Sequence, residues 1–408
     1  MKKIIFREWG LESSRYWGLL AILGLVAGIG GLAALYMEHN GHWVTGMSNN
    51  IVWGTPHVFA VFLIVAASGA LNVASIGSVF GKIVYKPLAR LSGLLAIALL
   101  IGGLLVLVLD LGRPDRLIVA MTTYNFKSIF AWNIFFYTGF VVIVIAYLWT
   151  MAERVGNKYS KGVGLFAFVW RLLLTTGTGS IFGFLVARQA YDTAVLAPLF
   201  IVMSFAFGLA IFLLVLMYSY QLDDRPLGDA MLRRLKNLLG VFVAGVLFLV
   251  LVYHLTKLYG TKYHGVEYFL LAGGGFYTFL FWFGWVLIGN LVPLGIIYHP
   301  VLGMNRNWLA GACGAVIVGG LAAMYVIIIG SQAYPMEMFP GMTVVEGSLL
   351  DNVNGQVSSY VPSLPEFLLG LGGMAVALLI TAVGIRVLQF LPESLTDEVA
   401  DPHALAKG

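Results

Sequence analysis

The sequence consists largely of apolar runs of about twenty residues, separated by short polar segments. A helix needs about 20 residues to cross a hydrocarbon core of about 30 Å, so each run is long enough to span a membrane. Of the 408 residues, 60% are hydrophobic and 11% are charged, which is far more apolar than a soluble domain. The net charge of +5 is modest. The sequence therefore predicts an all-α integral membrane protein and argues against a nucleic-acid-binding protein.

We expect a single polytopic domain over residues 1–408 with about ten membrane-spanning helices. The first run is longer than the roughly 7–15 apolar residues of a signal peptide, so we interpret it as an uncleaved helix. The predicted spans are 17–37, 53–76, 89–111, 129–151, 165–187, 196–219, 236–257, 268–290, 308–330 and 365–391.

The positive charges predict the orientation of these helices. Most of the 24 Lys and Arg residues fall in the termini and in alternate loops. Because cytoplasmic loops carry an excess of Lys and Arg, these segments are predicted to be cytoplasmic. Both termini are then inside, as ten spans require, and the segment that follows the third helix lies on the outer face.

An unusual concentration of charge closes the third helix, at Asp110–Arg116. Polar residues of the neighbouring helices fall at the same predicted depth, and in an antiparallel bundle their ends would converge on one patch. Ionisable groups at membrane depth are commonly functional. The main candidates for a site in this patch are His57, Asp110, Arg113, Trp53 and Asn133. The secondary candidates are Arg116, Arg188, Tyr191, Glu38 and His39.

These residue types suit the oxidation of a quinol, which must lose two protons and two electrons. A histidine such as His57 can accept a proton or bind a quinone carbonyl, and a carboxylate such as Asp110 can relay the proton. Glu38 and His39 could belong to an exit path for protons. A structural interpretation stays open, because Arg113 would also stabilise the carbonyl end of the helix.

The cysteine and histidine content bears on bound cofactors. The single cysteine, Cys313, cannot hold an iron–sulfur cluster, which needs about four thiolates. Only His57 and His254 lie clearly inside predicted spans, whereas a membrane b-type haem usually needs two facing histidines. We therefore expect no haem, iron–sulfur cluster or metal ion in this chain.

Two segments resemble the NrfD/PsrC family, the membrane subunits of polysulfide reductase, nitrite reductase and related respiratory complexes. The first is Asp110-Leu-Gly-Arg-Pro-Asp-Arg116, which follows a glycine-rich apolar helix. The second is Trp53-Gly-Thr-Pro-His57, followed by the small residues of 66–70. The ten-helix length and the Leu391-Pro-Glu-Ser tail are similar to the longer branch of that family. This branch includes the DsrP, Hmc-complex and hydrogenase-2 membrane subunits, and DsrP of the DsrMKJOP complex is the nearest resemblance.

The resemblance implies two four-helix bundles, here at 53–187 and 196–330, with two flanking helices and an outer loop at 331–364. It implies an exchangeable menaquinone or ubiquinone near the outer face of the first bundle. A four-cluster ferredoxin-like iron–sulfur protein would dock above that site. His57 matches the family's quinone-site histidine, and Asp110 and Arg113 match its motif. The chain departs from the family at the turn 180–183, which lacks the tyrosine that contacts quinone.

The favoured function is therefore a quinone-reactive subunit of a respiratory redox complex. It would lie in the cytoplasmic membrane of a bacterium or archaeon, with sulfur metabolism as the expected pathway. Such a subunit would work with other subunits in the lipid bilayer and would not be a complete enzyme alone. One alternative is a secondary transporter or proton-translocating subunit, although no clearly broken pair of helices supports it. The other is a purely structural membrane anchor.

Overall fold

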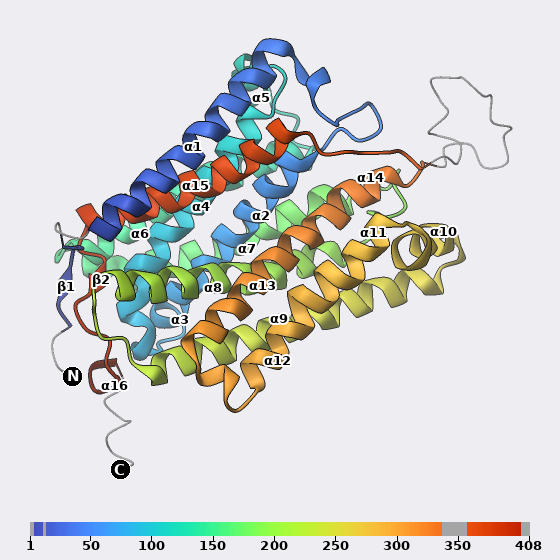
Figure 1. Cartoon of the computed structure of the whole chain (residues 1–408). Coiled ribbons are helices and arrows are strands. Elements are labelled where there is room, and N and C mark those ends of the chain that lie inside the picture. The colour runs from blue at the N-terminus through green and yellow to red at the C-terminus, as the bar shows by residue number, and fades with distance from the viewer. Residues whose placement is uncertain (1–3, 11–13, 337–356, 401–408) are drawn as a thin grey trace, which may run out of the picture.

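The structure of the chain is a computed structural model that describes residues 4–10, 14–336 and 357–400. Within these ranges ten helices are long and apolar enough to cross a membrane, and the predicted all-helical membrane fold is confirmed (Figure 1). The spans are Ser14–Asn40, Thr55–Ser78, Ile83–Leu109, Ile129–Ala152, Gly156–Gly183, Leu196–Leu222, Asp229–Tyr259, Phe276–Tyr298, Arg306–Ala333 and Leu364–Val387.

Several spans combine more than one type of helix. The α-helical parts of the first five spans are α1 (Ser14–Asn40), α2 (Thr55–Ala70) with α3 (Asn72–Ser78), α4 (Ala89–Leu109), α6 (Ile129–Ala152) and α7 (Ser160–Gly183). Those of the other five are α8 (Leu196–Leu222), α9 (Asp229–Tyr259), α11 (Phe276–Phe279) with α12 (Val292–Tyr298), α13 (Arg306–Tyr325) with α14 (Ser331–Ala333), and α15 (Leu364–Val387). The short elements are α5 (Leu117–Thr122), α10 (His264–Tyr268), α16 (Asp397–Ala400) and the strands β1 (Phe6–Arg7) and β2 (Leu391–Pro392).

The long helices pack in two sets of four. In the first set α2 packs on α4, α4 on α6, α6 on α7 and α7 back on α2. In the second set α8, α9, the α11–α12 span and α13 contact one another in the same cyclic way. Helix α8 packs on both α2 and α7 and so joins the sets, while α1 pairs with α15 along α4 (Figure 1).

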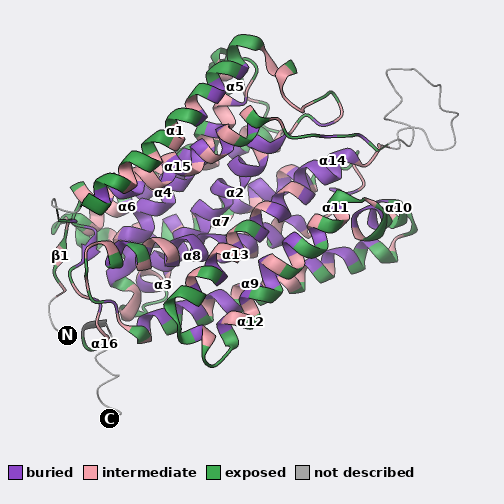
Figure 2. Cartoon of the chain, in the orientation of Figure 1, coloured by how far each residue is buried: buried purple, intermediate pink, exposed green. Residues whose placement is uncertain are grey.

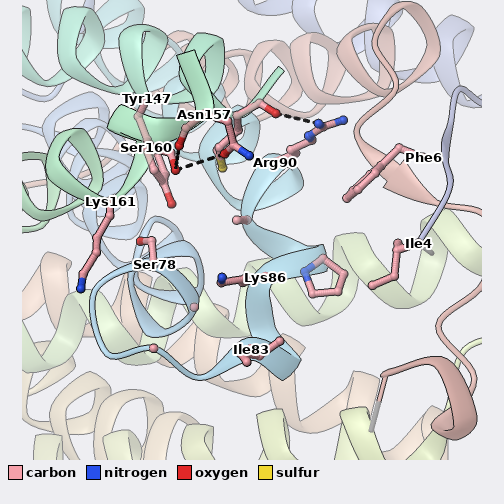
Figure 3. Close-up of a pocket in the computed structure, with 15 residues that line it drawn as sticks. Ile4, Phe6, Ser78, Ile83, Lys86, Arg90, Tyr147, Asn157, Ser160 and Lys161 are labelled. Atoms are coloured by element: carbon pink, nitrogen blue, oxygen red, sulfur yellow. Dashed lines mark hydrogen bonds between the residues drawn. The ribbon is translucent and has the colours of Figure 1, made fainter. Parts of the chain in front are cut away.

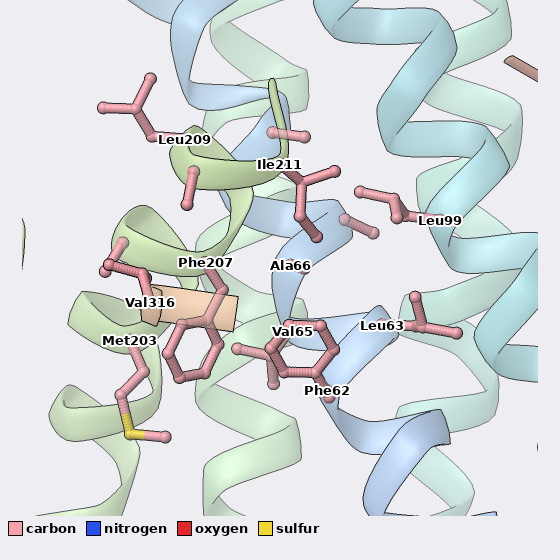
Figure 4. Close-up of a cluster of buried hydrophobic side chains, with 14 of the residues drawn as sticks. Phe62, Leu63, Val65, Ala66, Leu99, Met203, Phe207, Leu209, Ile211 and Val316 are labelled. Carbon is pink, nitrogen blue, oxygen red and sulfur yellow. The ribbon is translucent and has the colours of Figure 1, made fainter. Parts of the chain in front are cut away.

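Helix α2 lies at the centre of this arrangement. It is buried along almost its whole length, whereas α1 has a broad exposed side (Figure 2). Phe62 of α2 packs against Phe207 of α8, with their ring centroids 5.2 Å apart (Figure 4). Gly69 permits this close approach, because a Cβ there would lie 1.6 Å from the carbonyl oxygen of Ser204.

Most predicted spans differ from the structure by a few residues at their ends, and three differences are larger in their consequences. The short helix α5 was not predicted. The eighth span runs from Phe276 to Tyr298 and not over 268–290, because the three glycines 273–275 interrupt the helix and Gly275 adopts a φ of 56°. The ninth span continues to Ala333, so the predicted outer loop 331–364 begins later. Residues 337–356 of that loop lie outside the described ranges.

The two ends of the described chain meet. Strand β1 pairs antiparallel with β2, with Phe6 opposite Pro392. This contact places both ends at the same side of the helices, opposite the end that carries Asp110 (Figure 1). Which of the two sides is cytoplasmic stays a prediction.

Candidate functional site

A buried pair of titratable side chains joins the beginning of α2 to the end of α4. His57 Nδ1 lies 2.8 Å from Asp110 Oδ2, and the two side chains are 18% and 1% exposed. The other carboxylate oxygen of Asp110 is buried and has no hydrogen-bond partner among the described residues. His42 flanks the same residue, with its Nε2 3.0 Å from the Asp110 carbonyl oxygen. Asp110 therefore lies between His57 and His42, and His42 Nε2 is 4.0 Å from its second carboxylate oxygen.

The beginning of α2 is fixed by residues from the other end of the sequence. The backbone N–H of Thr55 donates to the Tyr360 hydroxyl at 2.7 Å, and that hydroxyl donates to Glu366 at 2.7 Å. Glu366 is fully buried and also accepts from the N–H of Gly46. Because the first N–H groups of a helix have no partners within it, these contacts hold the turn that carries His57.

His57 opens onto a cavity of about 410 Å³ in the first set of helices. Most of the lining is apolar, from α2, α4, α5, α6 and α7, and includes Leu104 and Met121. The polar exceptions include Asn133, Tyr137 and Thr178. This is the usual make-up of a small-molecule site, an apolar slot with a few placed polar groups.

Trp53 forms one wall of this cavity. Its ring stacks on that of His57, with centroids 6.1 Å apart, and meets Phe182 edge-on at 5.6 Å. The backbone at Trp53 is held by the Gln332 side chain, which accepts from its N–H and donates to its carbonyl oxygen. Arg188 supports this segment by donating to the carbonyl oxygens of Gln332 and Asn50. Burial lowers the pKa of the Arg188 guanidinium.

The structure thus brings four of the five main candidates together: His57, Asp110, Trp53 and Asn133. The fifth, Arg113, lies at the surface and binds Asp115 through two hydrogen bonds of 3.1 Å. These bonds raise the pKa of Arg113 and lower that of Asp115.

The secondary candidates lie outside the cavity. Arg116 is exposed, as are Glu38 and His39 at the end of α1. Arg188 holds the segment that precedes α2, as described above. The Tyr191 hydroxyl is buried and donates to the carbonyl oxygen of Ile328 at 2.8 Å, and burial raises its pKa.

Sequence reasoning missed His42 and Tyr137. Tyr137 lies one helical turn from Asn133 on α6, and its hydroxyl is 3.4 Å from Thr178 Oγ1. The four-residue spacing of Asn133 and Tyr137 in an otherwise apolar helix was the available signal. His42 follows α1 in a loop, and nothing in the sequence near it indicates a contact with Asp110.

A second buried pair was also missed. His254 Nδ1 on α9 lies 2.6 Å from Glu267 Oε2 on α10, and their side chains are 8% and 0% exposed. Lys257, one turn further along α9, is buried and donates to the carbonyl oxygen of Gln189. This pair lies beside a void of only about 10 Å³.

Comparison with known proteins places the chain in a family. The family model described as "Polysulphide reductase, NrfD" matches residues 43–336, which is well over half of the chain. The chain belongs to the NrfD family. The match includes both helices that supply the His57–Asp110 pair and ends before α15.

Individual relatives match over 69–97% of the chain. The Hdr-like menaquinol oxidoreductase integral membrane subunit of Archaeoglobus fulgidus is 30% identical, over 97% of this chain and 99% of that protein. A selenate reductase subunit of Mesobacillus selenatarsenatis is 22% identical, over 91% and 93%. Protein NrfD of Escherichia coli is 22% identical, over 69% of this chain and 96% of its own length. The first relative therefore aligns with this chain over nearly its whole length, α15 included.

Proposed function

We propose that this chain is the quinone-reactive membrane subunit of an oxidoreductase complex and is not a complete enzyme alone. The observation that carries the proposal is the buried His57–Asp110 pair beside an apolar cavity of about 410 Å³. Ligand cavities commonly have volumes of roughly 300–1,000 Å³, so a quinone head group and the start of its isoprenoid tail fit this one. The names of the relatives, which include a menaquinol oxidoreductase subunit, support the same function.

The pair can take a proton from a quinol. Asp110 occupies Nδ1 of His57, so Nε2 is the ring nitrogen left for a quinol hydroxyl. A carboxylate bonded to one ring nitrogen makes the other a better base. His57 therefore accepts a proton from the quinol, and Asp110 stabilises the resulting positive charge. For each quinol oxidised to quinone, two protons and two electrons leave the cavity.

The electrons need an acceptor outside this chain. We propose a four-cluster ferredoxin-like iron–sulfur protein docked on the outer face, over the site. Menaquinone and ubiquinone both suit an apolar slot, and the name of the Archaeoglobus relative favours menaquinone. The setting would be the cytoplasmic membrane of a bacterium or archaeon, in a sulfur-metabolising complex of the DsrMKJOP type with this chain as its DsrP-like subunit.

Quinone binding tests this function directly. The full-length chain in detergent is titrated with a menaquinone analogue while the quenching of tryptophan fluorescence is recorded. Trp53→Phe identifies the part of the signal that comes from the cavity. We expect His57→Gln to weaken binding roughly five- to tenfold, because a hydrogen bond of about 1 kcal/mol is lost.

His39→Gln is the matched control, since His39 is exposed at the end of α1. It should bind the analogue as tightly as the unmodified chain. Unchanged binding by His57→Gln, or an equal loss in His39→Gln, would contradict the proposed site.

A specific observation favours a second candidate function, proton translocation. The His254–Glu267 pair is buried where α10 packs against the membrane-spanning α9, away from the cavity, with one carboxylate oxygen unpartnered among the described residues. Buried ionisable groups at membrane depth are typical of proton paths. If the pair carries protons, Glu267→Gln in proteoliposomes should lower the number of protons released per quinol but not the rate of quinol oxidation. Glu153→Gln, at an exposed glutamate directly after α6, is the control, and an unchanged proton yield in Glu267→Gln would rule this function out.

A further inference from the structure

A second large cavity lies at the opposite end of the first set of helices. It has a volume of about 790 Å³ and is lined by residues of α3, α4, α6 and α7 and of the connections between them. The amino-terminal segment closes one side through Ile4 and Phe6 (Figure 3). This is the end at which Lys and Arg concentrate in the sequence, far from the His57–Asp110 pair.

The lining of this cavity is positively charged. Lys86, Arg90 and Lys161 contribute to it, and none of the 15 lining residues is acidic (Figure 3). Lys86 and Lys161 are exposed, and their ammonium groups form no ion pair or hydrogen bond with any described residue. Arg90 is held in place, because it donates to the carbonyl oxygens of Gln389 and Met151 and lies 4.2 Å over the Phe6 ring. The cavity is therefore lined by two ammonium groups and a guanidinium, and no acidic residue in its lining neutralises them.

Neutral groups around the cavity also favour an anion. The spans Ile83–Leu109 and Gly156–Gly183 begin at this end of the helices, and the amino end of a helix attracts negative charge. The Tyr147 hydroxyl lies beside Ser78, and both residues add neutral polar groups to the lining.

The position of the cavity favours a lipid over a soluble anion. Lys86, Arg90 and Lys161 lie in the first turns of the spans Ile83–Leu109 and Gly156–Gly183, which is the depth of lipid head groups. Ile83, Pro87 and Met151 give the same cavity an apolar wall. Basic pockets between membrane helices suit anionic head groups. We propose that this cavity binds the phosphodiester head group of an anionic phospholipid, of the phosphatidylglycerol or cardiolipin class.

Lipid titration of the purified full-length chain tests the proposal. Dioctanoyl phosphatidylglycerol, dioctanoyl phosphatidylcholine and inorganic phosphate are each added in a neutral detergent, and the midpoint of thermal unfolding is measured. We expect only phosphatidylglycerol to raise the midpoint. A lysine near a head group contributes roughly fivefold in affinity. Lys86→Gln with Lys161→Gln should therefore weaken the effect about 25-fold, whereas Lys86→Arg with Lys161→Arg should preserve it.

Lys82→Gln with Lys158→Gln is the matched control. It removes the same charge within four residues of Lys86 and Lys161, at residues that do not line the cavity, and should keep the affinity of the unmodified chain. An equal shift with inorganic phosphate would show a soluble ligand, and an equal shift with phosphatidylcholine would show binding through the acyl chains. Either result overturns the proposal, as does an equal loss in the control and the cavity variant.

Discussion

Replacing Asp110 by asparagine isolates the charge of the His57–Asp110 pair, because the two side chains have nearly the same shape. The amide oxygen can still accept from His57 Nδ1, which lies 2.8 Å from the carboxylate oxygen. What the variant loses is the attraction between the carboxylate and a protonated His57. If His57 takes the proton from the quinol, the step that forms the positive charge becomes slower.

The size of the effect follows from the geometry. Two unit charges about 4 Å apart attract by about 4 kcal/mol at an effective dielectric constant of about 20, which suits a pair this close to the protein surface. Each 1.36 kcal/mol of activation free energy corresponds to a factor of about ten in rate. Because asparagine keeps the hydrogen bond, we expect Asp110→Asn to lower kcat roughly 100- to 1,000-fold. The KM for quinol should change little, since the cavity walls are unaltered.

The assay is quinol oxidation by the assembled complex, with dimethylnaphthoquinol as the donor and with co-purification of the partner subunits as the test of assembly. Asp115→Asn makes the same chemical change five residues away, in an exposed ion pair with Arg113. It should leave kcat within about twofold, because exposed ion pairs contribute little. An assembled Asp110→Asn complex with nearly unchanged kcat would refute the proposed role of the pair.

Two further predictions concern the support of the site. Tyr360→Phe removes the hydroxyl that binds the beginning of α2, and it should lower the free energy of unfolding by roughly 1–3 kcal/mol; an unchanged midpoint of thermal unfolding would contradict this. At the other end of α2 from His57, the fully buried Arg171 donates a hydrogen bond of 2.8 Å to Asn72 Oδ1. Asn72→Leu should lower the free energy of unfolding by roughly 1.5–3 kcal/mol, because it leaves the guanidinium without its partner. Arg171→Met should leave the free energy of unfolding nearly unchanged or raise it. The reverse order of the two variants in the same melting experiment would show that this reasoning is wrong.

The fold was predictable where it depends on the length of apolar runs. A lipid-facing helix such as α1 and a buried one such as α2 both need about twenty apolar residues, so both were found. The eighth span was misplaced because it depends on backbone conformation. Gly275 adopts a positive φ, and the sequence shows three glycines but not which one breaks the helix. Helix α5 was missed because six residues between two spans are too few for a periodic pattern.

The candidate site was predictable where it depends on the ends of antiparallel helices. His57 lies in the first turn of α2, and Asp110 directly follows α4. Because these two consecutive spans run in opposite directions, the two residues fall at the same depth. Side-chain direction was not predictable in this way. Arg113 lies three residues from Asp110 yet points to the surface, where it is neutralised by Asp115 in the same turn. Tyr137 lies inside an apolar helix. Its position beside Thr178 in the cavity wall depends on how α6 packs against α7, which the sequence does not show.

The two buried histidine–carboxylate pairs differ in whether a quinone could bind beside them. Their geometries are similar, at 2.8 Å for His57–Asp110 and 2.6 Å for His254–Glu267. The cavity beside the first pair holds about 410 Å³, whereas the void beside the second, about 10 Å³, is about the size of a single water. The rings of Tyr253 and Phe281 pack edge-on against His254 and fill the space that a head group would need. At His57 that space stays open because α4 ends at Leu109 and the short α5 forms the cavity wall instead. A quinone site therefore needs both a titratable pair and an open cavity beside it. Of the two pairs in the described part of the chain, only His57–Asp110 has both.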